Sequence, residues 1–120
     1  MKLMPQEIEV WYLIPALRRE IAKIFISDFR FSQKQVAEIL GITESAISQY
    51  LKDKRAHELK FNEKEMAEIR KTAKRIINDK ENCNKYVYKL TMLLRGTDAV
   101  CALHKKQDKS LSENCHICME

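Results

Sequence analysis

The stretch Ser32–Lys54 reads SQKQVAEILGITESAISQYLKDK, and it decides the fold expected for this chain. Two short helices can be placed on either side of Gly41, which stands where a tight turn needs a positive φ that only glycine adopts without strain. Ala37 is small enough to let two helices approach closely. Ser32 and Thr43 precede the two helices, where each side chain can accept a hydrogen bond from a free backbone N–H. This pattern is typical of a helix-turn-helix.

The apolar residues of the stretch divide into two inward faces. Their spacing of three and four residues is that of one side of a helix. Ile42 and Ile47 fall where side chains must fill the gap between the two helices. The first helix contributes Val36, Ala37, Ile39 and Leu40, and the second contributes Ile47, Tyr50 and Leu51. A two-helix corner within a generic helical core is the alternative interpretation of the same pattern.

The same assignment leaves a polar face on the second helix. Short hydrogen-bonding side chains can reach base edges and phosphates in a major groove, so double-stranded DNA is the expected partner. The residues expected on this exposed face are Thr43, Glu44, Ser45, Ser48, Gln49 and Lys52.

Individual roles follow from the side-chain chemistry and the position along the helices. Gln33, at the start of the first helix, can donate to a phosphate and fix the register on DNA. Glu44 either accepts a hydrogen bond from a cytosine amino group or simply stabilises the first turn of its helix. The expected base-reading residues are Ser45, Ser48 and Gln49, and the expected phosphate contacts are Thr43, Lys52, Lys54 and Arg55.

Residues 37–55, AEILGITESAISQYLKDKR, resemble the second and third helices of λ-repressor-like (XRE) DNA-binding domains. The wider pattern adds MPQEIEVWYLIPALRREIAK (residues 4–23), VCALH (100–104) and NCHIC (114–118). Together these motifs resemble a group of small archaeal predicted transcriptional regulators with a cysteine-containing C-terminal tail. The resemblance implies a DNA-binding regulator, without identifying its operator or its signal.

Size and composition agree with a small helical regulator. The 120 residues suffice for one domain with a small appendage, and only two Gly and two Pro occur among many helix-forming residues. We therefore expect an all-α protein: a helix-turn-helix domain over residues 1–80, and a metal-binding or cluster-binding tail over residues 81–120 packed on it. The net charge of +5 suits a polyanionic partner. No apolar run is long enough to span a membrane and no signal peptide is evident, so a cytoplasmic location is expected.

The helices around the motif can be placed from caps and apolar spacing. Pro5 is suited to the first position of a helix, and Pro15 is expected to kink that segment or to begin the next one. Trp11 and Tyr12 are expected to pack in the core or against a second subunit, because they share an apolar face. Asn62 and Glu65 form a capping-box pattern at the start of a later helix. A last helix is expected from about Asn82 to Arg95, with Gly96 closing it.

All four cysteines follow residue 82: Cys83, Cys101, Cys115 and Cys118. In a reducing cytosol they should be thiols or metal ligands, and a polar tail that ends in C-x-x-C has no evident packing reason to contain cysteines. All four cysteines would suit a [4Fe–4S] or [2Fe–2S] cluster, which we favour slightly. Replacing Cys83 by His104 gives a Cys3His set that would suit Zn²⁺. In that case Cys83 is an ordinary buried thiol.

The sequence therefore predicts a DNA-binding transcriptional regulator that forms a homodimer and has an iron–sulfur site for redox or iron sensing. The nearest alternative is the same regulator with a purely structural zinc site. Alternatives of another class are a small iron–sulfur or thiol redox protein and a protein-interaction module of antitoxin type. An enzyme is not expected, since the chain has no phosphate-binding glycine loop and no defensible catalytic triad, and no small-molecule substrate is inferred.

Overall fold

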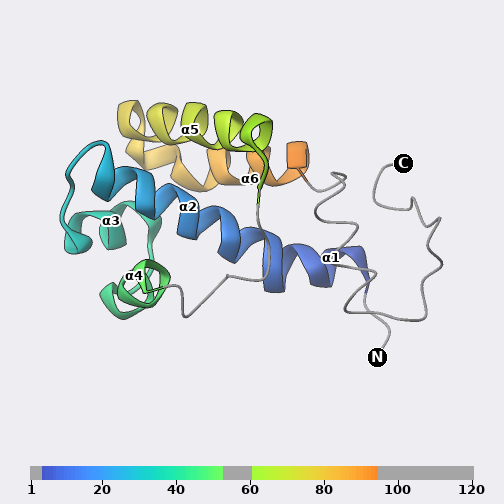
Figure 1. The fold of residues 1–120 in the computed structure, drawn as a ribbon, viewed down its shortest axis with the longest axis horizontal. Helices are drawn as coiled ribbons and strands as arrows, with labels where there is room; N and C mark the ends of the chain where they lie inside the picture. The colour runs from blue at the N-terminus through green and yellow to red at the C-terminus, as the bar shows by residue number, and fades with distance from the viewer. Residues whose placement is uncertain (1–3, 53–60, 95–120) are drawn as a thin grey trace.

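The computed structural model describes residues 4–52 and 61–94, in which all regular secondary structure is helical. The all-α class expected from composition therefore holds for these residues. The elements, in chain order, are α1 (Pro5–Ile8), the π-helix η1 (Glu9–Leu13), α2 (Ile14–Ser27), α3 (Gln33–Leu40), α4 (Glu44–Leu51), α5 (Glu63–Asn78), the 3₁₀ turn η2 (Lys80–Asn82) and α6 (Cys83–Leu94) (Figure 1).

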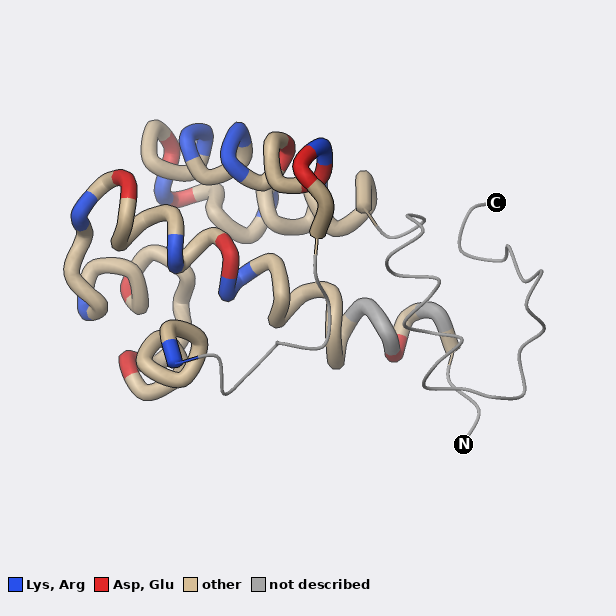
Figure 2. The backbone as a smooth tube through the Cα atoms, viewed as in Figure 1, with Lys and Arg blue, Asp and Glu red and all other residues tan. Residues whose placement is uncertain are grey.

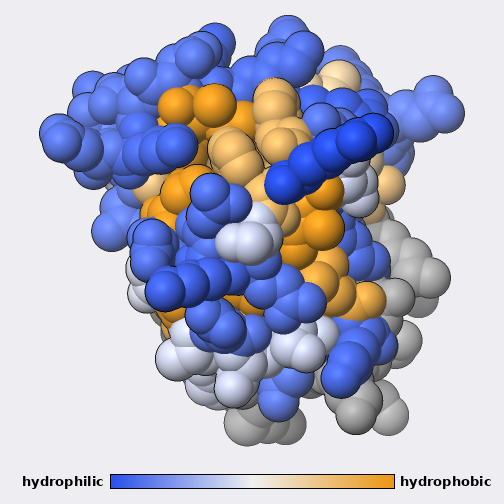
Figure 3. Space-filling model, turned by 90° about the vertical axis from the view of Figure 1, so that its left-hand side faces the viewer, coloured by the Kyte–Doolittle hydropathy of each residue, from blue (hydrophilic) through white to orange (hydrophobic). Residues whose placement is uncertain are grey.

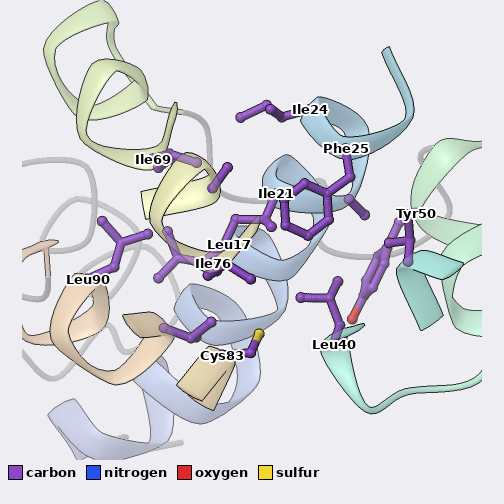
Figure 4. Packing of buried hydrophobic residues seen from close by; sticks show 14 of the residues in the cluster. Leu17, Ile21, Ile24, Phe25, Leu40, Tyr50, Ile69, Ile76, Cys83 and Leu90 are labelled. Carbon is purple, nitrogen blue, oxygen red and sulfur yellow. The ribbon is translucent and has the colours of Figure 1, made fainter. Parts of the chain in front are cut away.

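Helix α2 is the centre of the bundle and contacts α3, α4, α5 and α6. Its inward side chains recur at helical spacing, and Leu17, Ile21 and Phe25 are completely buried. Figure 4 shows them extending into a cluster with side chains from the surrounding helices. Because burying one such side chain stabilises the fold by about 1.5–3 kcal/mol, this helix anchors the elements on both of its sides.

The junction between η1 and α2 is shaped by Pro15, the second residue of α2. Proline donates no hydrogen bond, and its ring clashes with the carbonyl four residues earlier in a regular α-helix. Here that earlier residue is Trp11, which lies in the π-helical turn. A π turn inserts one residue, and one residue corresponds to a rotation of about 100° around the helix axis.

Trp11 and Tyr12 were expected to share an apolar face that packs in the core or against a second subunit. Trp11 is instead 50% exposed, whereas Tyr12 is half-buried and packs against the core, and the rotation at the π turn accounts for this difference. The prediction that Trp11 packs in the core is therefore wrong for the single chain.

Helices α5 and α6 run beside each other on α2 and close the core from one side (Figure 1). The capping box predicted at the start of α5 is present: the Asn62 side chain accepts from the Glu65 N–H at 2.8 Å, and Glu65 accepts from the Asn62 N–H at 2.9 Å. The second carboxylate oxygen of Glu65 is buried without a hydrogen-bond partner. The inward face of α6 contains Cys83, Val87, Leu90 and Leu94, which recur at helical spacing and are buried.

The corner between α5 and α6 is held by the carboxylate of Asp79. It accepts hydrogen bonds from the Asn82 amide at 2.9 Å and from the Tyr86 hydroxyl at 3.0 Å. These two bonds, with a smaller contribution from the positive charge of Lys85, lower the pKa of Asp79. The bond to Asp79 is also the main reason that the pKa of Tyr86 is raised.

An aromatic cluster closes the end of the bundle where α2 leads into α3. Phe25 packs edge-on against Phe29 and Phe31, with ring centroids 6.4 and 5.8 Å away. The Lys80 ammonium lies 5.3 Å from the Phe31 ring centroid, in the position of a cation–π contact. Figure 3 views this end of the molecule, where apolar surface runs between hydrophilic side chains.

No helix within residues 4–52 and 61–94 combines the length and the apolar character needed to cross a membrane.

Candidate nucleic-acid interface

Helix α3 begins at a complete capping box. The Ser32 hydroxyl accepts from the Gln35 N–H at 3.1 Å, and the Gln35 side chain accepts from the Ser32 N–H at 2.8 Å. This reciprocal pair satisfies two backbone donors that a helix start leaves free. The Ser32 cap expected from the sequence is confirmed, and it fixes Gln33 as the first residue of the helix, where it is exposed.

The turn after α3 depends on the left-handed conformation of Gly41, with φ 68° and ψ 32°. Its N–H donates to the Ala37 carbonyl, and the N–H of Ile42 donates to the same oxygen at 3.1 Å. A Cβ at Gly41 would meet no atom within 4 Å, so the requirement for glycine comes from φ alone. The positive φ predicted for this position is confirmed.

Helix α4 starts where Thr43 accepts a hydrogen bond from the Ala46 N–H at 3.1 Å. Its inward face contains Ala46, Ile47 and Tyr50, which are buried against α2 and α3. Ile47 is completely buried, as expected for a residue that fills the space between the helices, whereas Ile42 is half-buried. The cap, the turn and the buried face together fix the position of α4 on the bundle and the side that it exposes.

The outward side of α4 is polar and accessible at its first turn and at its end. Thr43, Glu44 and Ser45 are exposed at the start, and Lys52 is exposed at the C-cap. Glu44 lies in the first turn, where a carboxylate stabilises the positive end of the helix dipole. The structure thus brings four of the predicted contact residues onto the surface of one helix.

Two predicted base-reading residues are less accessible than the sequence suggested. Ser48 and Gln49 are half-buried, so the expectation that they are exposed was wrong in degree. The side-chain oxygen of Gln49 is buried and has no hydrogen-bond partner. Reading an adenine through both amide atoms needs that oxygen at the base edge, so Gln49 would first have to change its rotamer. Lys54 and Arg55 lie outside the described residues.

Sequence reasoning missed two cations beside the start of α3. Arg30 and Lys34 are exposed and flank the Ser32 cap in the sequence, close to the predicted phosphate contact Gln33. Arg30 adopts a left-handed φ of 55°. The sequence feature that could have identified them is their position next to a helix start, where backbone N–H groups also favour an anion.

Positive charge is concentrated elsewhere in the described residues. Figure 2 shows Lys and Arg along α5, whereas α4 has few charged side chains. Helix α2 contacts both of these helices and lies between them in Figure 1. The exposed cations of α5 are Lys64, Arg70, Lys71, Lys74 and Arg75. Lys71 pairs with Glu68 at 3.5 Å on the surface, which contributes little to stability.

Cys83 is the one predicted metal ligand within the described residues, since Cys101, His104, Cys115 and Cys118 lie outside them. It is 5% exposed and belongs to the buried cluster shown in Figure 4. Burial raises the pKa of its thiol, and the positive charge of Arg18 opposes that rise. Within residues 4–52 and 61–94 no three His, Cys, Asp or Glu side chains are grouped to hold a metal ion.

No protein-family model, no curated protein and no solved structure matches this chain.

Proposed function

We propose that this protein is a sequence-specific regulator that binds double-stranded DNA through a λ-repressor-like helix-turn-helix formed by α3 and α4. The observation that supports this most directly is the construction of α4. A cap at Thr43 and a left-handed turn at Gly41 fix the helix on a buried Ile47, and this leaves its first turn polar and exposed. Such a helix is suited to enter a major groove with its N-terminal residues at the base edges.

The exposed side chains suggest a division of roles. Ser45 is the best placed base reader, because it is exposed in the first turn of α4 and its hydroxyl can donate or accept. Gln33 and Thr43 stand at two helix starts, where side chains and backbone N–H groups favour phosphate oxygens. Lys52 adds a phosphate contact at the far end of α4. A homodimer would read two half-sites about 34 Å apart, one helical turn of DNA.

Selection of binding sites from a pool of random duplexes, followed by affinity measurements, tests this proposal. Ser45→Ala should weaken binding to the selected site by about 1–3 kcal/mol and relax the preference at one base pair. Ser27→Ala is the matched control, because Ser27 is also exposed but lies at the end of α2. If no sequence is enriched, or if both variants behave alike, the proposed role of α4 is wrong.

We further propose an iron–sulfur site made by Cys83, Cys101, Cys115 and Cys118. A bound cluster would supply sensitivity to iron or oxygen. The contribution of this chain would be to hold α6, whose first residue is Cys83, in the one arrangement that sets the dimer contacts and the spacing of the two α4 helices.

One observation favours the zinc alternative. The burial that raises the pKa of the Cys83 thiol opposes the thiolate form that a ligand must adopt. A Zn²⁺ site made by Cys101, His104, Cys115 and Cys118 would leave Cys83 as a core residue.

Metal and sulfide analysis of protein purified without oxygen separates the two sites. For the cluster we expect iron with acid-labile sulfide, which Cys83→Ala removes and His104→Ala retains. One zinc per chain, removed by His104→Ala and retained by Cys83→Ala, would overturn the sensor and leave a structural metal. The unfolding midpoint of each variant, measured alongside, separates loss of a ligand from loss of the fold.

A further inference from the structure

A groove of about 350 Å³ lies between the first half of α2 and α6. The two helices are in contact and run in opposite directions (Figure 1), so the start of α2 lies beside the end of α6. Arg18 of α2 and Asn84 of α6 therefore line one end of the groove, and Ile14 and Met92 line the other. The proposed DNA interface on α3 and α4 shares none of these residues.

The polar end of the groove contains a cation that pairs with no other described residue. Arg18 is half-buried, and its guanidinium forms no hydrogen bond or ion pair within residues 4–52 and 61–94. Its positive charge acts on the pKa of the Cys83 thiol, which places it near the first residue of α6. No Asp or Glu is among the described residues that line the groove. Because a cation that is partly removed from water costs free energy unless an anion pairs with it, this end is suited to an anionic group.

The remainder of the groove is mainly apolar. Ile14 lines it from α2, and Val87, Tyr88 and Met92 line it from α6. From Asn84 to Met92 the helix rises about 12 Å, at 1.5 Å per residue. An apolar surface of this length beside one cation suits a molecule with an anionic group at one end and an apolar chain of about ten carbon atoms behind it.

We propose that the groove between α2 and α6 binds a monocarboxylate with an apolar chain of the length of decanoate. Arg18 binds the carboxylate, because the N–H groups of a guanidinium match its two oxygens, and the amide of Asn84 donates a further hydrogen bond. The apolar chain lies along Ile14, Val87 and Met92. This inference adds a small-molecule ligand to the proposed regulator and does not rest on DNA binding.

Isothermal titration calorimetry of the full chain with sodium decanoate tests the proposal. The titration is made without DNA and below the concentration at which decanoate forms micelles. We expect one saturable site per chain. Acetate lacks the apolar chain, and decyltrimethylammonium has the chain with the opposite charge. Each should bind about tenfold more weakly than decanoate, or less tightly still.

Three variants locate the site. Arg18→Gln should weaken decanoate binding about tenfold or more, because the charged partner of the carboxylate is lost. Arg70→Gln is the matched control, since it removes the same charge from an exposed residue of α5 that does not line the groove, and it should leave the affinity unchanged. Tyr88→Asp changes a side chain that is 59% exposed, so the fold should tolerate it. It should also weaken decanoate about tenfold, because it replaces apolar wall by a charge that repels the carboxylate.

Three results would overturn the proposal. Absence of saturable decanoate binding would show that water, another part of the chain or a second copy fills the groove. Equal affinity for decyltrimethylammonium would show adsorption of the apolar chain without recognition of the carboxylate. Unchanged decanoate affinity in Tyr88→Asp, or in Arg18→Gln with an unaltered unfolding midpoint, would place the ligand elsewhere on the protein.

Discussion

Helices α4 and α5 lie against the same central helix, yet they present opposite kinds of surface. Helix α4 has eight residues and exposes Glu44 and Ser45 in its first turn, while Thr43 and Lys52 are exposed at its two caps, and only Lys52 of these four is a cation. Helix α5 has sixteen residues and exposes five cations. Net charge alone would therefore direct attention to α5 as the DNA-binding surface.

The comparison shows that the charge of a helix and the fixed orientation of its exposed side chains are separate properties. A row of Lys and Arg on a helix attracts any polyanion, but it has no means of distinguishing one base pair from another. Helix α4 has little charge, whereas its start is fixed by a cap, a left-handed turn and a buried isoleucine. We assign the specific contacts to α4 for that reason. Two experiments test this assignment against α5, and a third tests one residue of α4.

The largest effect is expected from truncating the buried isoleucine of each helix. Ile47→Ala and Ile69→Ala each remove a completely buried side chain, so each should lower the free energy of unfolding by about 2–5 kcal/mol in a denaturant titration. Only Ile47→Ala should also weaken DNA binding under conditions where both variants are folded, because Ile47 positions α4. If both variants lost DNA affinity equally, the assignment of the specific contacts to α4 and not to α5 would be wrong.

A smaller effect is expected from removing surface charge, measured as the salt dependence of DNA affinity. Lys52→Ala should reduce the salt slope by about one unit and weaken all sequences alike, by about 1 kcal/mol at moderate salt. The double variant Arg70→Gln/Lys74→Gln removes two exposed cations of α5 and should leave the slope unchanged. The reverse pattern would place DNA on α5.

The smallest effect is expected at Gln49, whose buried oxygen lacks a partner. Gln49→Met removes that oxygen at similar volume and should raise the free energy of unfolding by about 0.5–1 kcal/mol, as read from thermal unfolding. A site preference that stays the same would show that Gln49 reads no base. A preference that relaxes at one position would show that the residue is retained for recognition at a cost in stability.

Local chemistry made much of this structure predictable from the sequence. The caps at Ser32, Thr43 and Asn62 each have a hydrogen-bonding side chain at a helix start, and the positive φ of Gly41 follows from the turn between two apolar helices. The inward faces of α2 and α6 follow from helical spacing. Each of these signals lies within a few residues of the feature that it specifies.

The failures involve relations between elements. Trp11 is exposed because the π turn adds one residue to the helix. The regular spacing of apolar residues does not predict that turn. The partial burial of Ser48 and Gln49 depends on how closely α4 lies against its neighbours. The grouping of five exposed cations on α5, away from α4, likewise becomes visible only when the helices are assembled (Figure 2).

The outward rotation of Trp11 has a practical consequence. It is the only tryptophan of the chain, so its fluorescence reports on one place alone. A half-exposed indole emits at a wavelength that shifts when water leaves its surroundings. Intrinsic fluorescence therefore reports, without a chemical dye, the binding of any molecule or segment to the first helical turns of the protein.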